Sequence, residues 1–140
     1  MPEAPAIELQ RPDIAPWKEG GTGVDWVHVF DSGRPGPRVM VQALTHGNEI
    51  CGAIALDRLL RLAARPVRGK LVLAFANVEA FRKFDPANPY ASRFVDEDFN
   101  RVWTREVLDG SRDSVELRRA RRSSIESRGP NSASSAQTRL

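Results

Sequence analysis

The sequence has few of the residues that build disulfides, metal sites and membrane spans. Its 140 residues include one cysteine, Cys51, and two histidines, and no histidine follows His46. A single cysteine cannot form an intramolecular disulfide, which agrees with a reducing compartment, so we expect a cytoplasmic protein. No apolar run approaches the ~18 residues of a membrane helix, and the acidic, proline-rich start does not resemble a signal peptide. We therefore expect no membrane partner.

The charge is unevenly distributed, with the basic excess near the C-terminus. Residues 1–111 carry 14 Lys and Arg against 15 Asp and Glu, whereas residues 112–140 carry 7 against 3. Large apolar residues almost vanish in the last segment, which cannot bury enough surface to offset the entropy cost of ordering it. We therefore predict an N-terminal extension over residues 1–22, one domain over residues 23–120 and a disordered basic tail over residues 121–140.

The basic tail also bears on possible partners. No aromatic residues interleave its arginines, so the composition does not favour nucleic acid. An interaction protein that contacts an acidic partner through this tail stays an alternative, and steep salt dependence of binding would be its signature.

The apolar patterns predict an α/β fold. Residues 24–30 and 38–45 are typical of strands, and the Gly and Pro residues of 33–37 between them indicate a turn, so we expect a hairpin whose second strand is the more buried. Residues 50–64 have apolar positions at helical spacing, and residues 70–76 form a short apolar run typical of a buried strand. A strand-helix-strand unit with a right-handed crossover follows.

His46 and Glu49 lie three residues apart, just past the end of a predicted strand. Ligands of α/β sheets bind at the carboxyl ends of the strands, and Asn77 lies at another such end. Gly47 would allow a tight turn, so that imidazole and carboxylate converge on one ion. The alternative is a capping carboxylate beside a hydrogen-bonded histidine. Zinc enzymes normally use three protein ligands, so this pair would be an incomplete site.

A second polar cluster follows downstream. Residues 96–98 are an acidic run. Arg93 precedes this run, and Asn100 and Arg101 follow it. An arginine guanidinium binds a carboxylate through a bidentate fork and can also stabilise charge that develops on a carbonyl oxygen. These residue types favour an anionic acyl substrate. The alternative is a solvated loop whose arginines pair with its own carboxylates.

Three motifs occur in a fixed order: His-Gly-Asn-Glu at residues 46–49, Asn-Val-Glu-Ala-Phe at 77–81, and Arg-Phe-Val-Asp-Glu-Asp-Phe-Asn-Arg at 93–101. Together they resemble the succinylglutamate desuccinylase/aspartoacylase family of zinc-dependent amidohydrolases, over roughly residues 24 to 120. The resemblance implies the N-terminal part of a zinc-carboxypeptidase-like α/β/α fold with a mixed sheet. It also implies hydrolysis of an N-acyl amino acid or a related amide or ester.

The resemblance implies a role for each matching residue. His46 and Glu49 would bind one zinc ion (Zn²⁺), Arg93 would polarise the scissile carbonyl, and Asn100 and Arg101 would hold the carboxylate of a small-molecule substrate. The zinc would lower the pKa of a bound water toward ~7. The resemblance also implies that Asp98 supports the loop of residues 93–101 by hydrogen bonding.

Two parts of the family's site have no match in this sequence. Family members carry a third zinc ligand, a histidine, and a glutamate that acts as general base, both further along the chain. Here the helix that begins near residue 114 loses its apolar pattern after residue 120, and His28 reads as a structural histidine of the first strand. We therefore expect little or no activity from this chain alone. A truncated or frame-shifted product and a natural short form both stay open, as does a non-catalytic carboxylate-binding remnant. Exposed strand edges make oligomers possible.

Overall fold

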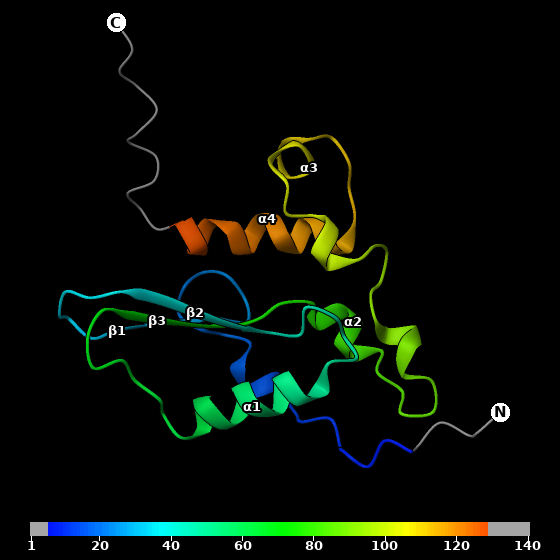
Figure 1. The fold of residues 1–140 in the computed structure, drawn as a ribbon, viewed down its shortest axis with the longest axis horizontal. Helices are drawn as coiled ribbons and strands as arrows, with labels where there is room; N and C mark the ends of the chain where they lie inside the picture. Colours follow the sequence, from blue (N-terminus) through cyan, green and yellow to red (C-terminus); the bar gives the residue numbers. More distant parts are fainter. Residues whose placement is uncertain (1–5, 129–140) are drawn as a thin grey trace, which may run out of the picture.

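The computed structural model describes residues 6–128, with side chains described through residue 124. It contains a three-stranded mixed sheet in the order β1-β3-β2 and several helices (Figure 1). In chain order the elements are η1 (Ala15–Trp17), β1 (Val27–Asp31), β2 (Arg38–Ala43), α1 (Ile50–Arg61), β3 (Lys70–Phe75), α2 (Val78–Arg82), η2 (Pro89–Ser92), η3 (Phe99–Arg101), α3 (Arg105–Asp109) and α4 (Val115–Arg128).

The strand pairing differs from the expected hairpin, which is wrong. β3 lies in the centre of the sheet, antiparallel to β1 with Val27 opposite Ala74, and parallel to β2 with Arg38 opposite Lys70. β3 is the most apolar of the three strands, and a central position buries both of its faces. The six residues that join β1 to β2 easily span two strand spacings, about 10 Å.

β1 and β2 both lie at edges of the sheet in the described part of the chain, and β2 is the more exposed of the two, so the expectation that it is the more buried strand is also wrong. Val39 is 49% exposed and Val41 is 40% exposed, whereas Val27 of β1 is fully buried. The strand-helix-strand unit is confirmed, because β2, α1 and β3 follow one another and the two strands are parallel. The handedness of its crossover stays a prediction.

The sheet lies between helices on its two sides, α1 on one and α4 on the other (Figure 1). The cluster of buried side chains beneath α1 includes Leu56, Leu60, Leu73 and Phe75. A second cluster joins α4 to the segment around η3 and includes Phe99, Val102, Leu117 and Ala120. The expectation of an α/β fold with a mixed sheet is therefore confirmed.

Helix α4 extends further than the sequence suggested. It continues to Arg128, so the predicted loss of helix after residue 120 is wrong. Arg119 donates hydrogen bonds to the carbonyls of Phe75 at 2.6 Å and Ala76 at 2.9 Å, which fastens the helix to the end of β3. The predicted disordered tail thus begins inside α4, and residues 129–140 lie outside the described residues.

The N-terminal segment packs on the domain. Ile14 is 5% exposed and belongs to the cluster beneath α1. The indole Nε1 of Trp17 donates to Asp57 Oδ1 of α1 at 2.7 Å. Within residues 6–128, no helix combines the length and the apolar character that crossing a membrane requires.

Candidate metal and substrate site

The ends of β2 and β3 lie side by side, and the chain continues from the first to His46 and from the second to Asn77. The N–H of Asn77 donates to the carbonyl of Leu44 at 2.8 Å, which holds the two strand ends together. Leu44 has a positive φ of 62°, an unusual conformation for a bulky residue. Its side chain is only 1% exposed, so core packing holds the strained backbone that leads directly to His46.

Gly47 lets the downstream loop approach His46 closely. A Cβ at this position would lie 2.3 Å from the carbonyl oxygen of Ser92 and 2.5 Å from the nitrogen of Phe81. The Gly47 N–H donates to the carbonyl of Arg93 at 3.1 Å. The expected tight turn is present, because the Glu49 N–H donates to the His46 carbonyl at 3.2 Å across Gly47. Gly47 is not among the residues with positive φ, so glycine is required here for the space it leaves and not for an unusual backbone conformation.

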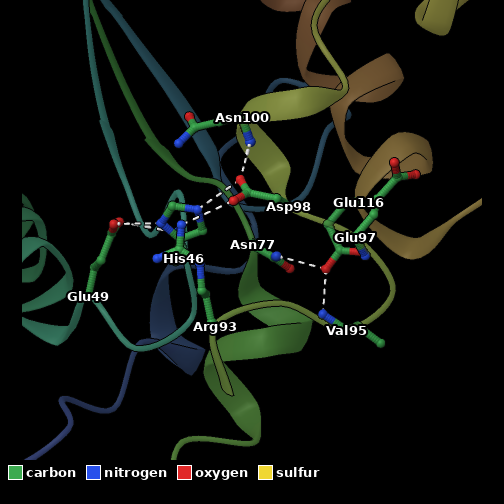
Figure 2. Close-up of polar contacts among 9 residues, drawn as sticks. All are labelled: His46, Glu49, Asn77, Arg93, Val95, Glu97, Asp98, Asn100 and Glu116. Carbon is green, nitrogen blue, oxygen red and sulfur yellow. Dashed lines mark hydrogen bonds and ion pairs between the residues drawn. The ribbon is translucent and has the colours of Figure 1, made fainter. Parts of the chain in front are cut away.

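His46 is buried and lies between two carboxylates (Figure 2). Its Nδ1 is 2.8 Å from Glu49 Oε1, and its Nε2 is 3.0 Å from Asp98 Oδ1. Glu49 is the N-cap residue of α1, and its second oxygen accepts the His46 N–H at 3.1 Å. Imidazole and carboxylate therefore contact each other directly, as the alternative of a capping carboxylate beside a hydrogen-bonded histidine also describes, and a second carboxylate lies on the opposite side of the ring. Their convergence on one ion stays a prediction.

Asp98 is fixed by several donors. Its Oδ1 accepts the backbone N–H of Asn100 at 2.9 Å, and its Oδ2 accepts Arg93 Nη2 at 3.0 Å. The contact with His46, followed by these two hydrogen bonds, holds the pKa of Asp98 well below its usual range. The carboxylate is consequently ionised at neutral pH and keeps the His46 ring in one orientation.

Glu116 of α4 is a buried carboxylate that sequence reasoning missed. It is fully buried, and Figure 2 shows it beside Asn77 and the loop at Val95. Burial alone would raise its pKa, but the hydrogen bonds from Val95, Asn77 and Asp96 outweigh that effect and lower the pKa. Helical spacing offered a signal, because Glu116 stands four residues before the buried Ala120.

Two predicted substrate residues lie at the edge of this arrangement. Asn100 joins it through its backbone N–H, while its side chain is exposed. Arg101 is exposed and forms no ion pair with another described residue. A hollow of about 600 Å³ lies elsewhere, lined by Trp26, Asn77 and arginines of α4, and His46 is not among its lining residues. The converging polar groups therefore mark the site better than the hollow does.

Comparison with known protein families shows which family the chain belongs to. The succinylglutamate desuccinylase/aspartoacylase catalytic domain matches residues 35–136. The chain belongs to this family. No curated protein matches the chain, and no solved structure does. The match covers His46, Glu49, Arg93 and Arg101, so the recognised resemblance is confirmed and the catalytic domain is of the desuccinylase/aspartoacylase type.

The residues present in this desuccinylase/aspartoacylase domain fit a zinc ion in part. Nδ1 of His46 and the Glu49 carboxylate face each other, as two ligands of one ion would. Asp98 holds the other ring nitrogen, which is the usual arrangement around a metal-bound histidine. Because Asp98 lies on the far side of the ring, it cannot join the same ion. Among residues 6–128, no three potential ligands are arranged to hold a metal.

Proposed function

We propose that this domain belongs to a zinc-dependent deacylase that cleaves the amide or ester bond of an N-acyl amino acid. The observation that carries the proposal is the clamped His46, with Glu49 at Nδ1 and Asp98 at Nε2, in a chain of this family. A histidine that is held at one nitrogen and faces a carboxylate with the other is prepared to bind a metal. The proposed zinc-carboxypeptidase-like fold accords with the mixed sheet and the site at its strand ends.

In this proposal His46 and Glu49 hold the zinc ion. Zinc would supply a Lewis acid and a water of lowered pKa, near ~7. Asp98 keeps the His46 ring oriented, with Nδ1 toward the metal position. Gly47 leaves room for the loop that brings Asp98 to that ring.

Arg93 is the proposed group that polarises the scissile carbonyl. Its side chain is 41% exposed, and its hydrogen bond within the described residues uses one guanidinium nitrogen on Asp98. The remaining donors are free to meet an oxygen that gains negative charge. Exposed Asn100 and Arg101 are proposed to hold the substrate carboxylate, since a free guanidinium suits a planar anion.

The proposal includes low activity of this polypeptide by itself. The described residues offer two proposed zinc ligands, His46 and Glu49, and no described carboxylate or imidazole other than those of Glu49 and Asp98 contacts the His46 ring. A general base alone is commonly worth ~10²–10⁴ in rate. Full turnover therefore requires a further ligand and base from outside the described residues.

The test is zinc stoichiometry of the purified chain, combined with hydrolysis assays on N-acyl-aspartate and N-acyl-glutamate compounds. Glu49→Gln should lower zinc occupancy strongly, whereas the matched control Glu79→Gln, at an exposed position of α2, should not. Equal zinc occupancy in wild type and Glu49→Gln would refute the metal site. Rapid turnover by the chain alone would refute the low-activity part of the proposal.

A second candidate is a non-catalytic carboxylate-binding protein. It is favoured by the same incomplete ligand set and by the two exposed guanidinium groups. In this case the chain would bind N-acyl-aspartate without zinc, and Arg93→Met or Arg101→Met would abolish binding. Binding that requires zinc, and that is lost in Glu49→Gln, would exclude it.

A further inference from the structure

Glu116 binds the loop that precedes Asp98 at several points. Its Oε1 accepts the Val95 N–H at 2.6 Å and the Asn77 side-chain amide at 2.9 Å. Its Oε2 accepts the N–H groups of Asp96 at 3.0 Å and Glu97 at 3.3 Å. One fully buried carboxylate therefore satisfies three consecutive backbone donors and the side chain at the end of β3.

The loop binds the start of α4 in return. Asp96 Oδ2 accepts the Val115 N–H at 2.8 Å, and Ser114 Oγ donates to Glu97 Oε1 at 2.5 Å. Arg112 adds an ion pair with Glu97. Loop and helix thus fix each other through reciprocal hydrogen bonds. Two of the three acidic side chains of the loop, Asp96 and Glu97, bind the start of α4.

The fixed segment stands between Arg93, which binds Asp98, and Asp98, which contacts His46. Arg93 lies just before the three N–H groups that Glu116 accepts, and Asp98 lies just after them. Arg93 and Asp98 also bind each other, which closes a short polar loop beside the imidazole (Figure 2). A shift of residues 95–97 would therefore move the carboxylate that contacts His46 Nε2.

We infer that Glu116 is a positioning residue, which fixes the loop over residues 93–98 so that Asp98 meets His46 and Arg93 faces the site. The importance of this role rests on the proposed function, but the geometry can be tested without zinc. Glu116→Gln keeps the size of the side chain and replaces one acceptor oxygen with a donor. A donor cannot accept the backbone N–H groups, so at least one hydrogen bond of the loop is lost.

The chain offers a direct test because it has two histidines, and His28 serves as an internal reference. The ring ¹⁵N signals of both histidines are recorded for the metal-free full-length chain, for Glu116→Gln and for the control Glu106→Gln on exposed α3. We expect the His46 signals to shift in Glu116→Gln alone, while the His28 signals stay in place. Amide exchange at residues 95–97 should become at least about tenfold faster in the same variant, as befits the loss of a charged acceptor.

A double variant separates positioning from general loosening of the structure. Asp98→Asn alone should shift the His46 signals, and adding Glu116→Gln should shift them no further, because Glu116 acts through Asp98. Unchanged His46 signals in folded Glu116→Gln, or a further shift in the double variant, would overturn the inference. If Glu116→Gln does not fold, Asn77→Ala removes one of the four donors instead; a His46 shift supports the inference and an unshifted signal contradicts it. Failure of zinc binding in wild type would contradict the proposed function and leave this result standing.

Discussion

The two histidines of this chain are both buried but lie in different surroundings. His28, in β1, is 8% exposed; its Nε2 donates to the Trp17 carbonyl at 2.8 Å, and its ring stacks on Phe30. His46, at the end of β2, is 4% exposed and meets a carboxylate at each ring nitrogen. Burial therefore does not distinguish the two histidines, whereas the partners of their ring nitrogens do.

The two histidines also differ in how far along the chain their contact partners lie. Residues close in sequence support His28, namely Trp17 and Phe30. His46 depends on Asp98, fifty-two positions away, and Asp98 depends on a loop that Glu116 of α4 holds. His46, the proposed zinc ligand, is accordingly the histidine whose geometry requires contacts from across the domain.

The largest expected effect is that of Gly47→Ala. Three backbone atoms lie within 2.5 Å of the added Cβ, so the loop must move away from His46 at a cost of about 3 kcal/mol. Gly52→Ala is the matched control, since its Cβ would meet only ordinary contacts from 3.4 Å and alanine favours a helix. Chemical denaturation measures both, and equal stability of the two variants would contradict the close approach.

Asp98→Asn should weaken zinc binding by about 10- to 100-fold, because the partner that orients His46 loses its charge. Asp109→Asn, at an exposed position of α3, is the control and should change zinc affinity less than about twofold. Competition with a chromophoric chelator measures both affinities. If Asp98→Asn binds zinc as wild type does, Asp98 does not support the ligand.

The lowered pKa of Glu116 predicts a contribution to acid unfolding. Its folded pKa lies below the unfolded value of about 4.3, so the stability from its ionised form is fully present above that pH and is lost as the pH falls through the folded pKa. Below about pH 4.3 the unfolding free energy of wild type should therefore fall more steeply than that of Glu116→Gln. Urea titrations at several pH values measure the slopes, and parallel slopes would contradict the assignment.

The smallest expected effect lies far from both histidines. Ala63, just after α1, has a positive φ of 52°, the conformation in which glycine commonly ends helices. Ala63→Gly should stabilise the fold by roughly 1 kcal/mol and leave zinc affinity unchanged. Thermal unfolding measures the gain, and a loss of stability would show that this backbone conformation is not strained.

Short-range patterns in the sequence predicted the three strands and the two longest helices, together with half of the candidate site. The helix and the buried strand follow from apolar spacing, and the His46 and Glu49 pair follows from a spacing of three residues at a strand end. The sheet order did not follow, because a short connection fits neighbouring strands and strands separated by another equally well.

Long-range contacts account for what the sequence did not predict. Asp98 was expected to support its own loop, but its contact with His46 joins residues that only the fold brings together. Glu116 looks like an ordinary helix carboxylate until the loop over residues 95–97 turns its N–H groups toward it. No local pattern encodes such a partner, although helical spacing places Glu116 on the buried face of α4.

The most direct test of the difference between the two histidines is the zinc affinity of wild type, His46→Ala and His28→Ala, measured side by side on folded protein. We predict that His46→Ala loses zinc binding by at least about 100-fold, as expected when a ligand of an already incomplete site is removed. His28→Ala should keep the wild-type affinity while its unfolding free energy falls. Zinc binding that survives His46→Ala, or that is lost only in His28→Ala, would contradict the assignment of the site.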